Sequence, residues 1–189
     1  MNAFFSFGGA SRRRVRILLA GLSAYGLAAL AWASFGTPLP RLVYNPSDSV
    51  AVGWYRIEPV SSPPRPLAVG SIVLTRLPAV AATLAAQRGY LPARIPLLKR
   101  VGAVAPQHVC IANGEVRIDG VLAAAVLRAD RQGRVLLAWP FCRRLRAGEL
   151  FLLSATNPAS FDSRYFGPIR TSAVLGVARP IRLTGWNDG

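Results

Sequence analysis

The stretch IPLLKRVGAVAP, residues 95–106, decides how this chain folds. The run is apolar and rich in β-branched residues, which is typical of a buried strand. It carries Lys99, the only lysine among the 23 lysine and arginine residues of the chain. A desolvated lysine can lose its proton near neutral pH, whereas an arginine stays charged. We therefore expect Lys99 to lie on a buried strand, in an apolar setting where its amine can act as a base.

The segments around this strand predict a mostly β domain with one short helical insert. Asn113-Gly114 lies between two alternating segments and predicts a hairpin, and Asp119-Gly120 marks a second turn. Pro78 and Gly89 are expected to bound the short helix, because they suit the first and last turns of a helix. SSPPRP, residues 61–66, predicts a loop. The other expected strands cover residues 49–59, 70–77, 108–118, 134–140, 149–156 and 172–183.

The N-terminal part predicts a single membrane-spanning helix. Residues 17–36 are apolar and follow four arginines within residues 12–16. The 19 residues of 17–35 would span about 28 Å as a helix, close to the thickness of a bilayer's hydrocarbon core. Arginines ahead of the span place the N-terminus, residues 1–16, in the cytoplasm. We expect a single-pass protein of a bacterial inner membrane, with a stalk at 37–43 and an exported, periplasmic domain at 44–189.

Two other interpretations of this segment remain open. Ala31-Trp32-Ala33 is a small-x-small pattern, so the segment could be a cleaved signal peptide. An uncleaved anchor is favoured because the apolar stretch is longer than the usual core of a signal peptide. A buried helix of a soluble domain is disfavoured, since the segment is apolar all round and begins at an arginine cluster.

Charge and cysteine content restrict the partners. The net charge of +15 suits an anionic phospholipid membrane, near which scattered arginines would hold the exported domain. No nucleic-acid partner is expected, because the arginines do not cluster on one predicted helix and no nucleic-acid motif occurs. Cys110 and Cys142 are expected to form a disulfide in an exported domain. With His108 as the single histidine, no four-ligand metal site is expected, and no cofactor either.

Three short stretches carry the candidate chemistry: YNPSDSVAVGWY (44–55), LLKRVGAV (97–104) and NPASFDSRYFGPI (157–169). Taken alone, each has an ordinary structural explanation, such as a turn or a surface ion pair. Together, in this order and behind an apolar helix, they resemble the signal peptidase I superfamily of membrane-anchored serine peptidases. The Gly-Trp-Tyr ending of the first stretch and the helical insert before the lysine strand are most similar to the TraF-type conjugative transfer peptidases. Ala51 departs from that pattern, which usually has proline there.

The resemblance implies a Ser-Lys dyad on a signal-peptidase-like β-fold. Ser49 would be the nucleophile and Lys99 the general base that takes its proton. The oxyanion hole would consist of the Ser49 backbone N–H and the Ser47 hydroxyl. An arginine in place of Lys99 could not act as this base, which would account for the one lysine of the chain.

The third stretch would supply the supporting residues. Ser160 matches the serine that orients the lysine amine in the family. Asp162 and Arg164 match its acidic and basic motif residues, and we expect them to form an ion pair that braces the site rather than to carry protons.

The substrate implied by the resemblance is a membrane-bound exported precursor, in particular a conjugative pilin precursor for conjugative transfer or type IV secretion. TraF-type members mature pilin, and some also join its ends into a ring. Two alternatives stay open: a general type I signal peptidase for exported proteins, and a catalytically silent assembly factor of a secretion channel. Intact Ser49, Lys99 and Asp162 disfavour the silent factor.

Overall fold

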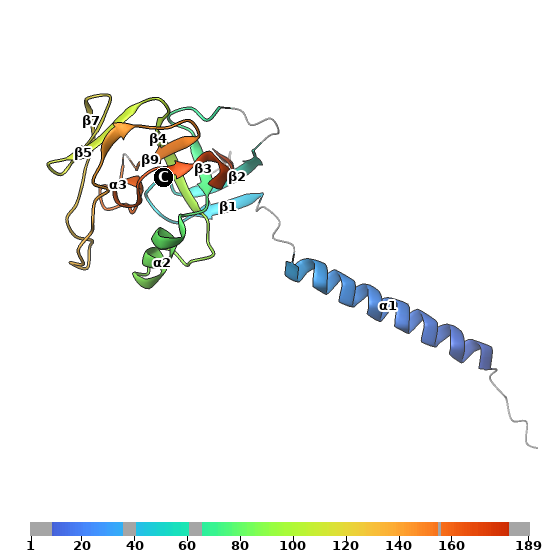
Figure 1. The fold of residues 1–189 in the computed structure, drawn as a ribbon. Helices are drawn as coiled ribbons and strands as arrows, with labels where there is room; N and C mark the ends of the chain where they lie inside the picture. Colours follow the sequence, from blue (N-terminus) through green and yellow to red (C-terminus); the bar gives the residue numbers. More distant parts are fainter. Residues whose placement is uncertain (1–8, 36–40, 61–65, 155, 182–189) are drawn as a thin grey trace, which may run out of the picture. The chain divides into compact units, whose positions relative to one another are not determined.

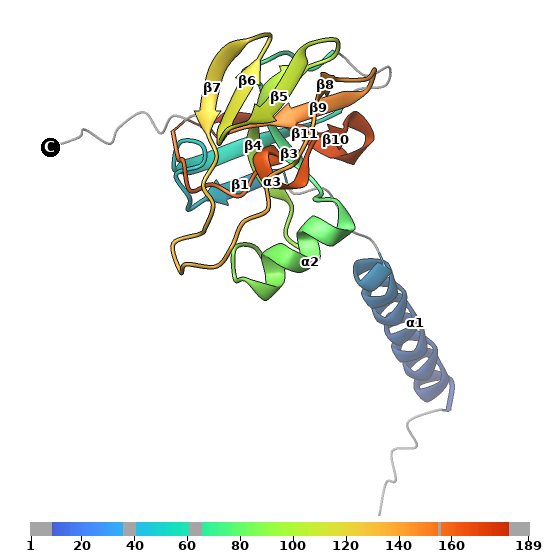
Figure 2. The same ribbon diagram turned by 60° about the vertical axis from the view of Figure 1, so that its left-hand side comes forward.

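The computed structural model describes residues 9–35, 41–60, 66–154 and 156–181. The chain divides into two compact units, Met1–Leu39 and Pro40–Gly189. Among these described residues, the first unit contains one helix and the second contains all the strands (Figures 1 and 2). The domain is therefore mostly β, as expected.

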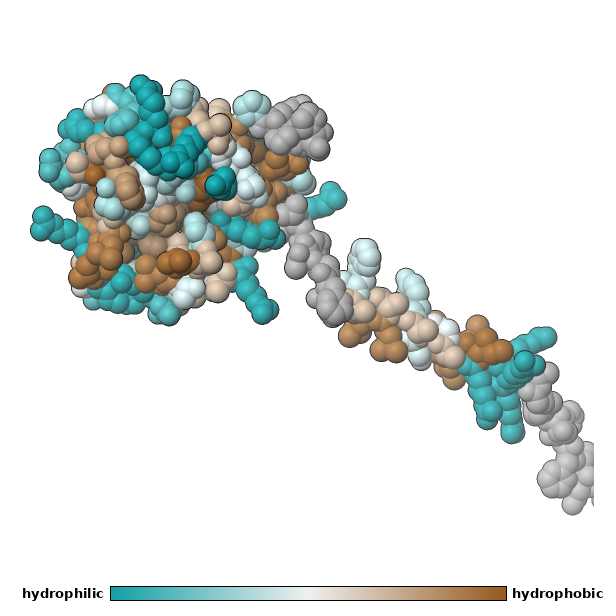
Figure 3. Space-filling view, in the orientation of Figure 1, coloured by the Kyte–Doolittle hydropathy of each residue, from teal (hydrophilic) through white to brown (hydrophobic). Residues whose placement is uncertain are grey.

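The helix of the first unit, α1 (Gly9–Phe35), is 27 residues long. Its part Arg12–Trp32 is long and apolar enough to cross a membrane, a property shared by anchors and signal sequences. Figure 3 shows strongly hydrophilic side chains gathered at one end of the helix, while apolar side chains and side chains of intermediate hydropathy continue along the rest. The helix thus starts before the expected span and includes its arginines. Residues 1–8 of the expected cytoplasmic segment and 36–40 around the stalk lie outside the described residues.

Two antiparallel sheets build the second unit. One has seven strands in the order β1-β2-β11-β3-β4-β9-β10, and the other has four in the order β7-β6-β5-β8. The strands of the larger sheet are β1 (Leu42–Asn45), β2 (Gly53–Pro59), β3 (Ile72–Thr75), β4 (Leu97–Val104), β9 (Glu149–Leu152), β10 (Ile169–Arg170) and β11 (Val174–Pro180). Those of the smaller sheet are β5 (His108–Ala112), β6 (Glu115–Ile118), β7 (Val121–Ala125) and β8 (Cys142–Arg144).

Three short helical elements complete this unit: α2 (Ala79–Gln87), α3 (Ser163–Phe166) and the 3₁₀ turn η1 (Thr171–Ala173). In both ribbon views α2 lies at the opposite end of the domain from β5 and β7 (Figures 1 and 2). Its N-cap is Pro78, and Gly89 adopts a positive φ of 70° just after its end, as expected from the two residues.

The expected central strand is confirmed as β4, which pairs with β3 on one edge and β9 on the other. The pairing with β9 shifts register at Gly102, where an added Cβ would lie 2.7 Å from the Leu153 Cβ. Glycine is therefore needed for the close approach of the two strands. Buried side chains of β4 and β9, among them Ala103 and Phe151, also pack against Val109 of the smaller sheet. The two sheets thus share one of the domain's hydrophobic clusters.

The two predicted turns of the smaller sheet are confirmed. Asn113 and Gly114 join β5 to β6 with positive φ values of 53° and 78°. Asp119 and Gly120 join β6 to β7 with positive φ values of 49° and 84°. Asparagine, aspartate and glycine tolerate this left-handed conformation, which two-residue hairpin turns require.

The expectations for two strands, 134–140 and 49–59, were wrong in part. Residues 134–140 form no strand beyond a single bridge between Ala129 and Val135. The backbone N–H of Leu136 donates to Arg128 and that of Trp139 to Arg164, so the segment is held by a loop and by α3 instead of a ladder. Residues 49–52 belong to a turn before β2, and β1 begins within the expected stalk. The expected loop at 61–66 lies, apart from its last residue, outside the described residues.

Candidate active site

Ser47 and Ser49 lie in the turn between β1 and β2. Their hydroxyl oxygens are 3.0 Å apart, and the Ser49 side chain is buried. The turn is fastened to the segment that follows β9: the Ser154 hydroxyl donates to the Ser49 carbonyl at 2.9 Å, and the Thr156 hydroxyl donates to the Asp48 carbonyl at 3.0 Å. A segment more than a hundred residues away in sequence therefore fixes the position of Ser49.

Lys99 lies on β4 opposite Val73 of β3, and its side chain is only 3% exposed. Its amine donates a hydrogen bond to the Ser160 hydroxyl. Burial lowers the pKa of this amine to about 8; the Asp162 charge opposes that shift, and the Arg164 charge adds to it. An amine with a pKa near 8 is neutral in a useful fraction of molecules at neutral pH, as a general base must be.

Asp162 and Arg164 form a fully buried ion pair at the start of α3. Arg164 Nε and Nη2 donate to the two carboxylate oxygens, each at 2.8 Å. Asp162 also caps α3 by accepting from the Arg164 N–H. The same carboxylate accepts from the Ser154 N–H at 3.0 Å, and the guanidinium donates to the Ser160 carbonyl at 3.1 Å. The pair thus connects Ser154, which contacts Ser49, with Ser160, which contacts Lys99.

A cavity of about 670 Å³ brings the two halves of the site together. Ser47, Ser49, Lys99 and Ser160 all line it. Within the described part of the chain, the Ser49 hydroxyl bonds to Ser47 and the Lys99 amine to Ser160, so the two groups face one space with different partners. Most of the remaining wall is apolar, with Leu97, Leu98, Ile95 and Leu136 among its residues. A second hollow of about 300 Å³, lined by Asp48, Arg100 and Thr156, also reaches Ser49.

The wall of the large cavity also includes four polar residues, here called the rim cluster: Arg88, Tyr90, Asp130 and Arg134. The Tyr90 hydroxyl donates to Asp130, and Arg134 Nε donates to the same carboxylate at 2.7 Å. Arg88 and Arg134 each also donate to a backbone carbonyl of the opposite segment. The rim cluster therefore ties the residues after α2 to residues 128–136, which explains why that segment is ordered without being a strand.

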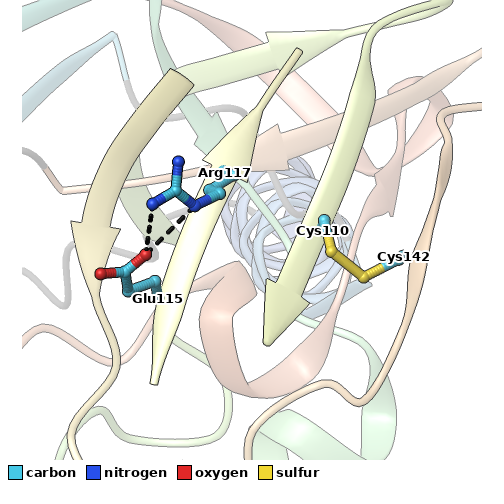
Figure 4. The surroundings of a disulfide bond; sticks show 4 residues. All are labelled: Cys110, Glu115, Arg117 and Cys142. Atoms are coloured by element: carbon cyan, nitrogen blue, oxygen red, sulfur yellow. Dashed lines mark hydrogen bonds and ion pairs between the residues drawn. A yellow bond between two sulfur atoms is a disulfide. The ribbon is translucent and has the colours of Figure 1, made fainter. Parts of the chain in front are cut away.

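The two cysteines lie apart from this cavity. Cys110 of β5 and Cys142 of β8 form a disulfide across the smaller sheet (Figure 4), which confirms the expected pairing. The bond joins strands of the sheet that packs on the core behind β4 and β9. It therefore supports the domain and is no part of the wall that carries Ser49 and Lys99.

The sequence singled out six candidate residues, and the structure brings them to one cavity or to the contacts beside it: Ser47, Ser49, Lys99, Ser160, Asp162 and Arg164. The sequence did not single out Asn45, Ser154 and Asn157, which contact these residues or Asp48. Asn157 Nδ2 donates to the Asp48 carboxylate, and the Asn157 carbonyl accepts from Arg164. Serine and asparagine in loops are too common to be singled out by type. The available signal was position, because Asn45 is the second residue of the first motif stretch, Asn157 is the first residue of the third, and Ser154 lies three residues before it.

Comparison with known proteins shows to which family this chain belongs. A family model described as "Signal peptidase, peptidase S26" matches residues 14–182. The conjugal transfer protein TraF of Agrobacterium tumefaciens (strain 15955) is 35% identical over 178 residues, which cover 89% of this chain and 96% of that protein. The plasmid transfer protein TraF of Escherichia coli is 32% identical over 179 residues, covering 89% and 97%.

Among solved structures, a signal peptidase I from Enterococcus faecalis V583 is 19% identical. It covers 60% of this chain and 97% of its own, with a TM-score of 0.37. The sequence matches, in contrast, extend over nearly the whole chain at more than 30% identity. On those matches, the chain belongs to the S26 signal peptidase family.

Proposed function

We propose that this protein is a membrane-anchored serine endopeptidase in which Ser49 is the nucleophile and Lys99 the general base. The observation that carries the proposal is the state of Lys99. Its amine is buried, has a pKa lowered to about 8 and is held by Ser160 at the wall of the cavity that Ser49 also lines. A surface lysine at a strand end would instead extend into water and stay charged.

The proposed reaction begins when the Ser49 hydroxyl turns from Ser47 toward the neutral Lys99 amine. Lys99 takes the proton as Ser49 Oγ attacks the scissile carbonyl, and the Ser49 N–H and Ser47 hydroxyl stabilise the oxyanion. One such donor typically contributes about 2.7–4 kcal/mol to transition-state stabilisation. The Lys99 ammonium then gives its proton to the leaving amine, and a water molecule or another amine releases the acyl group from Ser49. Ser160, Asp162 and Arg164 hold this arrangement without exchanging protons.

The proposed substrate is a conjugative pilin precursor held in the membrane. The TraF relatives, named for conjugal and plasmid transfer, support this choice. The long apolar helix would place the domain beside the membrane, and the mostly apolar cavity suits small uncharged side chains near the scissile bond. Release of the acyl-enzyme by water gives a cut chain, and release by the chain's own amine gives a ring.

The proposal is tested by co-expressing the full-length protein with a pilin precursor from the same conjugative system and following the precursor by mass spectrometry. The wild type should shorten the precursor, and Ser49→Ala and Lys99→Arg should leave it whole. A ring would lack one further water. Ser172→Ala and Arg56→Lys serve as matched controls, because both positions are exposed and lie outside the proposed dyad, while the changes again remove a serine hydroxyl and exchange one basic side chain for the other. Processing by Lys99→Arg would refute the dyad, since a guanidinium stays charged.

The same experiment separates the alternative of a general signal peptidase. In a second arm, the precursor of an ordinary secreted protein replaces the pilin precursor. Cleavage of pilin alone supports the proposal. Cleavage of the secreted precursor with pilin left intact would favour the general peptidase. A wild type that leaves both uncut would favour the silent assembly factor.

A further inference from the structure

Asn45, the last residue of β1, is the hub of the turn that carries Ser47 and Ser49. Its side chain is only 5% exposed and lines the large cavity. The amide nitrogen Nδ2 donates to the carbonyls of Ser47 at 2.6 Å, Val50 at 3.0 Å and Ala51 at 3.0 Å. The amide oxygen Oδ1 accepts from the Ser47 hydroxyl at 2.9 Å and from the Ser47 N–H at 3.3 Å. One buried amide thus contacts both ends of the turn.

These partners fix which way the amide points. An amide oxygen only accepts hydrogen bonds, and an amide nitrogen only donates them. Rotating the Asn45 amide by half a turn would set its oxygen against three carbonyl oxygens and its NH₂ group against the Ser47 N–H. The network therefore assigns Oδ1 to the side of Ser47.

The orientation of the amide also fixes the direction of the hydroxyl protons. Because Oδ1 carries no hydrogen, the Ser47 hydroxyl must use its one proton to donate to Asn45. In the 3.0 Å contact between the two serines, Ser49 is then the donor and Ser47 the acceptor. The resting order of donation is Ser49 to Ser47 to Asn45.

This order conflicts with the one that catalysis needs. In the proposed function, on which this inference rests, Ser49 must donate to Lys99 and Ser47 must donate to the oxyanion. Once Ser49 turns to Lys99, Ser47 is free to rotate its proton from Asn45 into the cavity. Oδ1 keeps the Ser47 N–H as a donor at 3.3 Å, so no buried acceptor is left unpaired.

We propose that Asn45 is the positioning residue of the oxyanion hole. At rest, Asn45 holds the Ser47 hydroxyl in place by accepting its hydrogen bond. During turnover, the Ser47 hydroxyl rotates and donates its hydrogen bond to the oxyanion instead. No bond is broken in this step, because both hydroxyl protons move by rotation about their Cβ–Oγ bonds. In this role Asn45 acts through Ser47 alone. Its contribution should therefore vanish when the Ser47 hydroxyl is absent.

The test is a double-mutant cycle with the full-length protein in detergent and a synthetic peptide that spans the pilin processing site. Asn45→Ala should lower kcat about 10- to 100-fold with KM nearly unchanged, because the oxyanion donor acts in the transition state. In a Ser47→Ala background, the same change should lower kcat less than about threefold further. Equal losses in both backgrounds would overturn the proposal.

Tyr55→Phe is the matched control for the turn itself. The Tyr55 hydroxyl donates to the Ala51 carbonyl at 2.7 Å, as Asn45 does, but does not bond to Ser47. Its removal should change kcat less than about threefold. A loss as large as that of Asn45→Ala would mean that Asn45 only stiffens the turn, and would overturn the proposal.

Where Asn45→Ala does not fold, as judged by circular dichroism and thermal unfolding, Asn45→Ser replaces it in the cycle. Its hydroxyl can still donate to a carbonyl of the turn, but the Oδ1 acceptor is gone, so kcat should again fall through Ser47. If the Ser49→Ala variant still cleaves the peptide, the proposed function is refuted. If Ser49→Ala is inactive but the effects of the Asn45 and Ser47 substitutions simply add, only the proposed role of Asn45 is refuted, and the proposed function stands.

Discussion

Two ion pairs of this domain join an arginine to an acidic residue two positions earlier, yet they lie in opposite environments. Glu115 and Arg117 lie on β6, where the side chains are 40% and 49% exposed (Figure 4). Asp162 and Arg164 lie at the start of α3, where the side chains are 0% and 1% exposed. Both arginines donate through two nitrogens to their carboxylates.

The difference teaches that residue types and spacing do not set the role of an ion pair. In water, the attraction between the charges of the exposed pair is screened, and such pairs contribute about 0–1 kcal/mol. In the buried pair, each charge is accommodated only because the other is present, together with Ser154 and Ser160. The buried pair is thus a scaffold for the candidate site, and the exposed pair is a local surface contact.

The largest effect is expected from Arg164→Leu, which leaves the Asp162 carboxylate buried without its partner. The free energy of unfolding should fall by about 3–5 kcal/mol. Chemical denaturation of the full-length protein in detergent measures this change. The double variant Asp162→Asn/Arg164→Leu should recover part of the loss, because it buries no charge. A loss below about 1 kcal/mol for the single variant would place the buried pair in the same class as the exposed one.

The disulfide of the smaller sheet should give the next effect. Cys110 and Cys142 are 32 residues apart in sequence, and closing a loop of this length stabilises a fold by about 3–4 kcal/mol in the chain-entropy model. The variant Cys110→Ser/Cys142→Ser should lose about this much stability while keeping the peptide-cleaving rate per folded molecule. Denaturation with and without reductant gives an independent value. Equal midpoints in both conditions would show that the smaller sheet does not depend on the bond.

Lys99 is a third buried ionisable group, and it should make the free energy of unfolding depend on pH. Its pKa is about 8 in the folded chain and near its ordinary value of 10.5 when unfolded. Between these values the unfolded chain binds more protons, so the free energy of unfolding should rise with pH by about 3 kcal/mol in total. Below pH 8 the amine is protonated in both states, and this contribution is flat.

Lys99→Met isolates the effect of that amine. The difference in unfolding free energy between wild type and Lys99→Met should change between pH 8 and pH 10.5 and stay constant below pH 8. The contributions of the other titrating groups to the unfolding free energy cancel in this difference. Parallel stability curves throughout would mean that burial does not perturb the amine. In the wild type, peptide cleavage should also fall about tenfold per pH unit below pH 8.

The smallest effect is expected from Arg117→Ala, the counterpart of Arg164→Leu in the exposed pair. The free energy of unfolding should change by less than about 0.5 kcal/mol, and raising the salt concentration should not reveal more. The same denaturation assay applies. A loss of several kcal/mol here would show that burial does not separate the two pairs.

The parts of the fold that sequence predicted are those in which the information is local. The apolar run around Lys99 and the turns at Asn113-Gly114 and Asp119-Gly120 depend on neighbouring residues, and all three formed as expected. Residues 134–140 have the composition of a strand, but their backbone partners, Arg128 and Arg164, belong to a loop and to α3. Val135 and Leu137 are accordingly exposed at 65% and 80%. The sequence of this segment alone could not predict that outcome, because its backbone partners lie outside the segment.

The residues of the candidate site also fall into two groups, those that the sequence could predict and those that it could not. Ser49, Lys99 and Asp162 could be chosen because their motifs occur together, and the structure brings the first two to one cavity. The residues that hold the motifs in place, Asn45 and Ser154, act through contacts with backbone carbonyls and N–H groups. Such contacts are set by the path of the chain, which the identity of a residue does not reveal.

The pKa of Lys99 also bears on how the protein would avoid unwanted proteolysis. With a pKa of about 8, the Lys99 amine is mostly protonated at pH 7, so under the proposed mechanism the unoccupied site would be mostly idle. A peptide side chain that fills the apolar cavity removes water from the amine and lowers its pKa further. Under the proposed mechanism, each bound substrate would then help to generate the base that cleaves it, while a site without substrate would keep its amine mostly protonated.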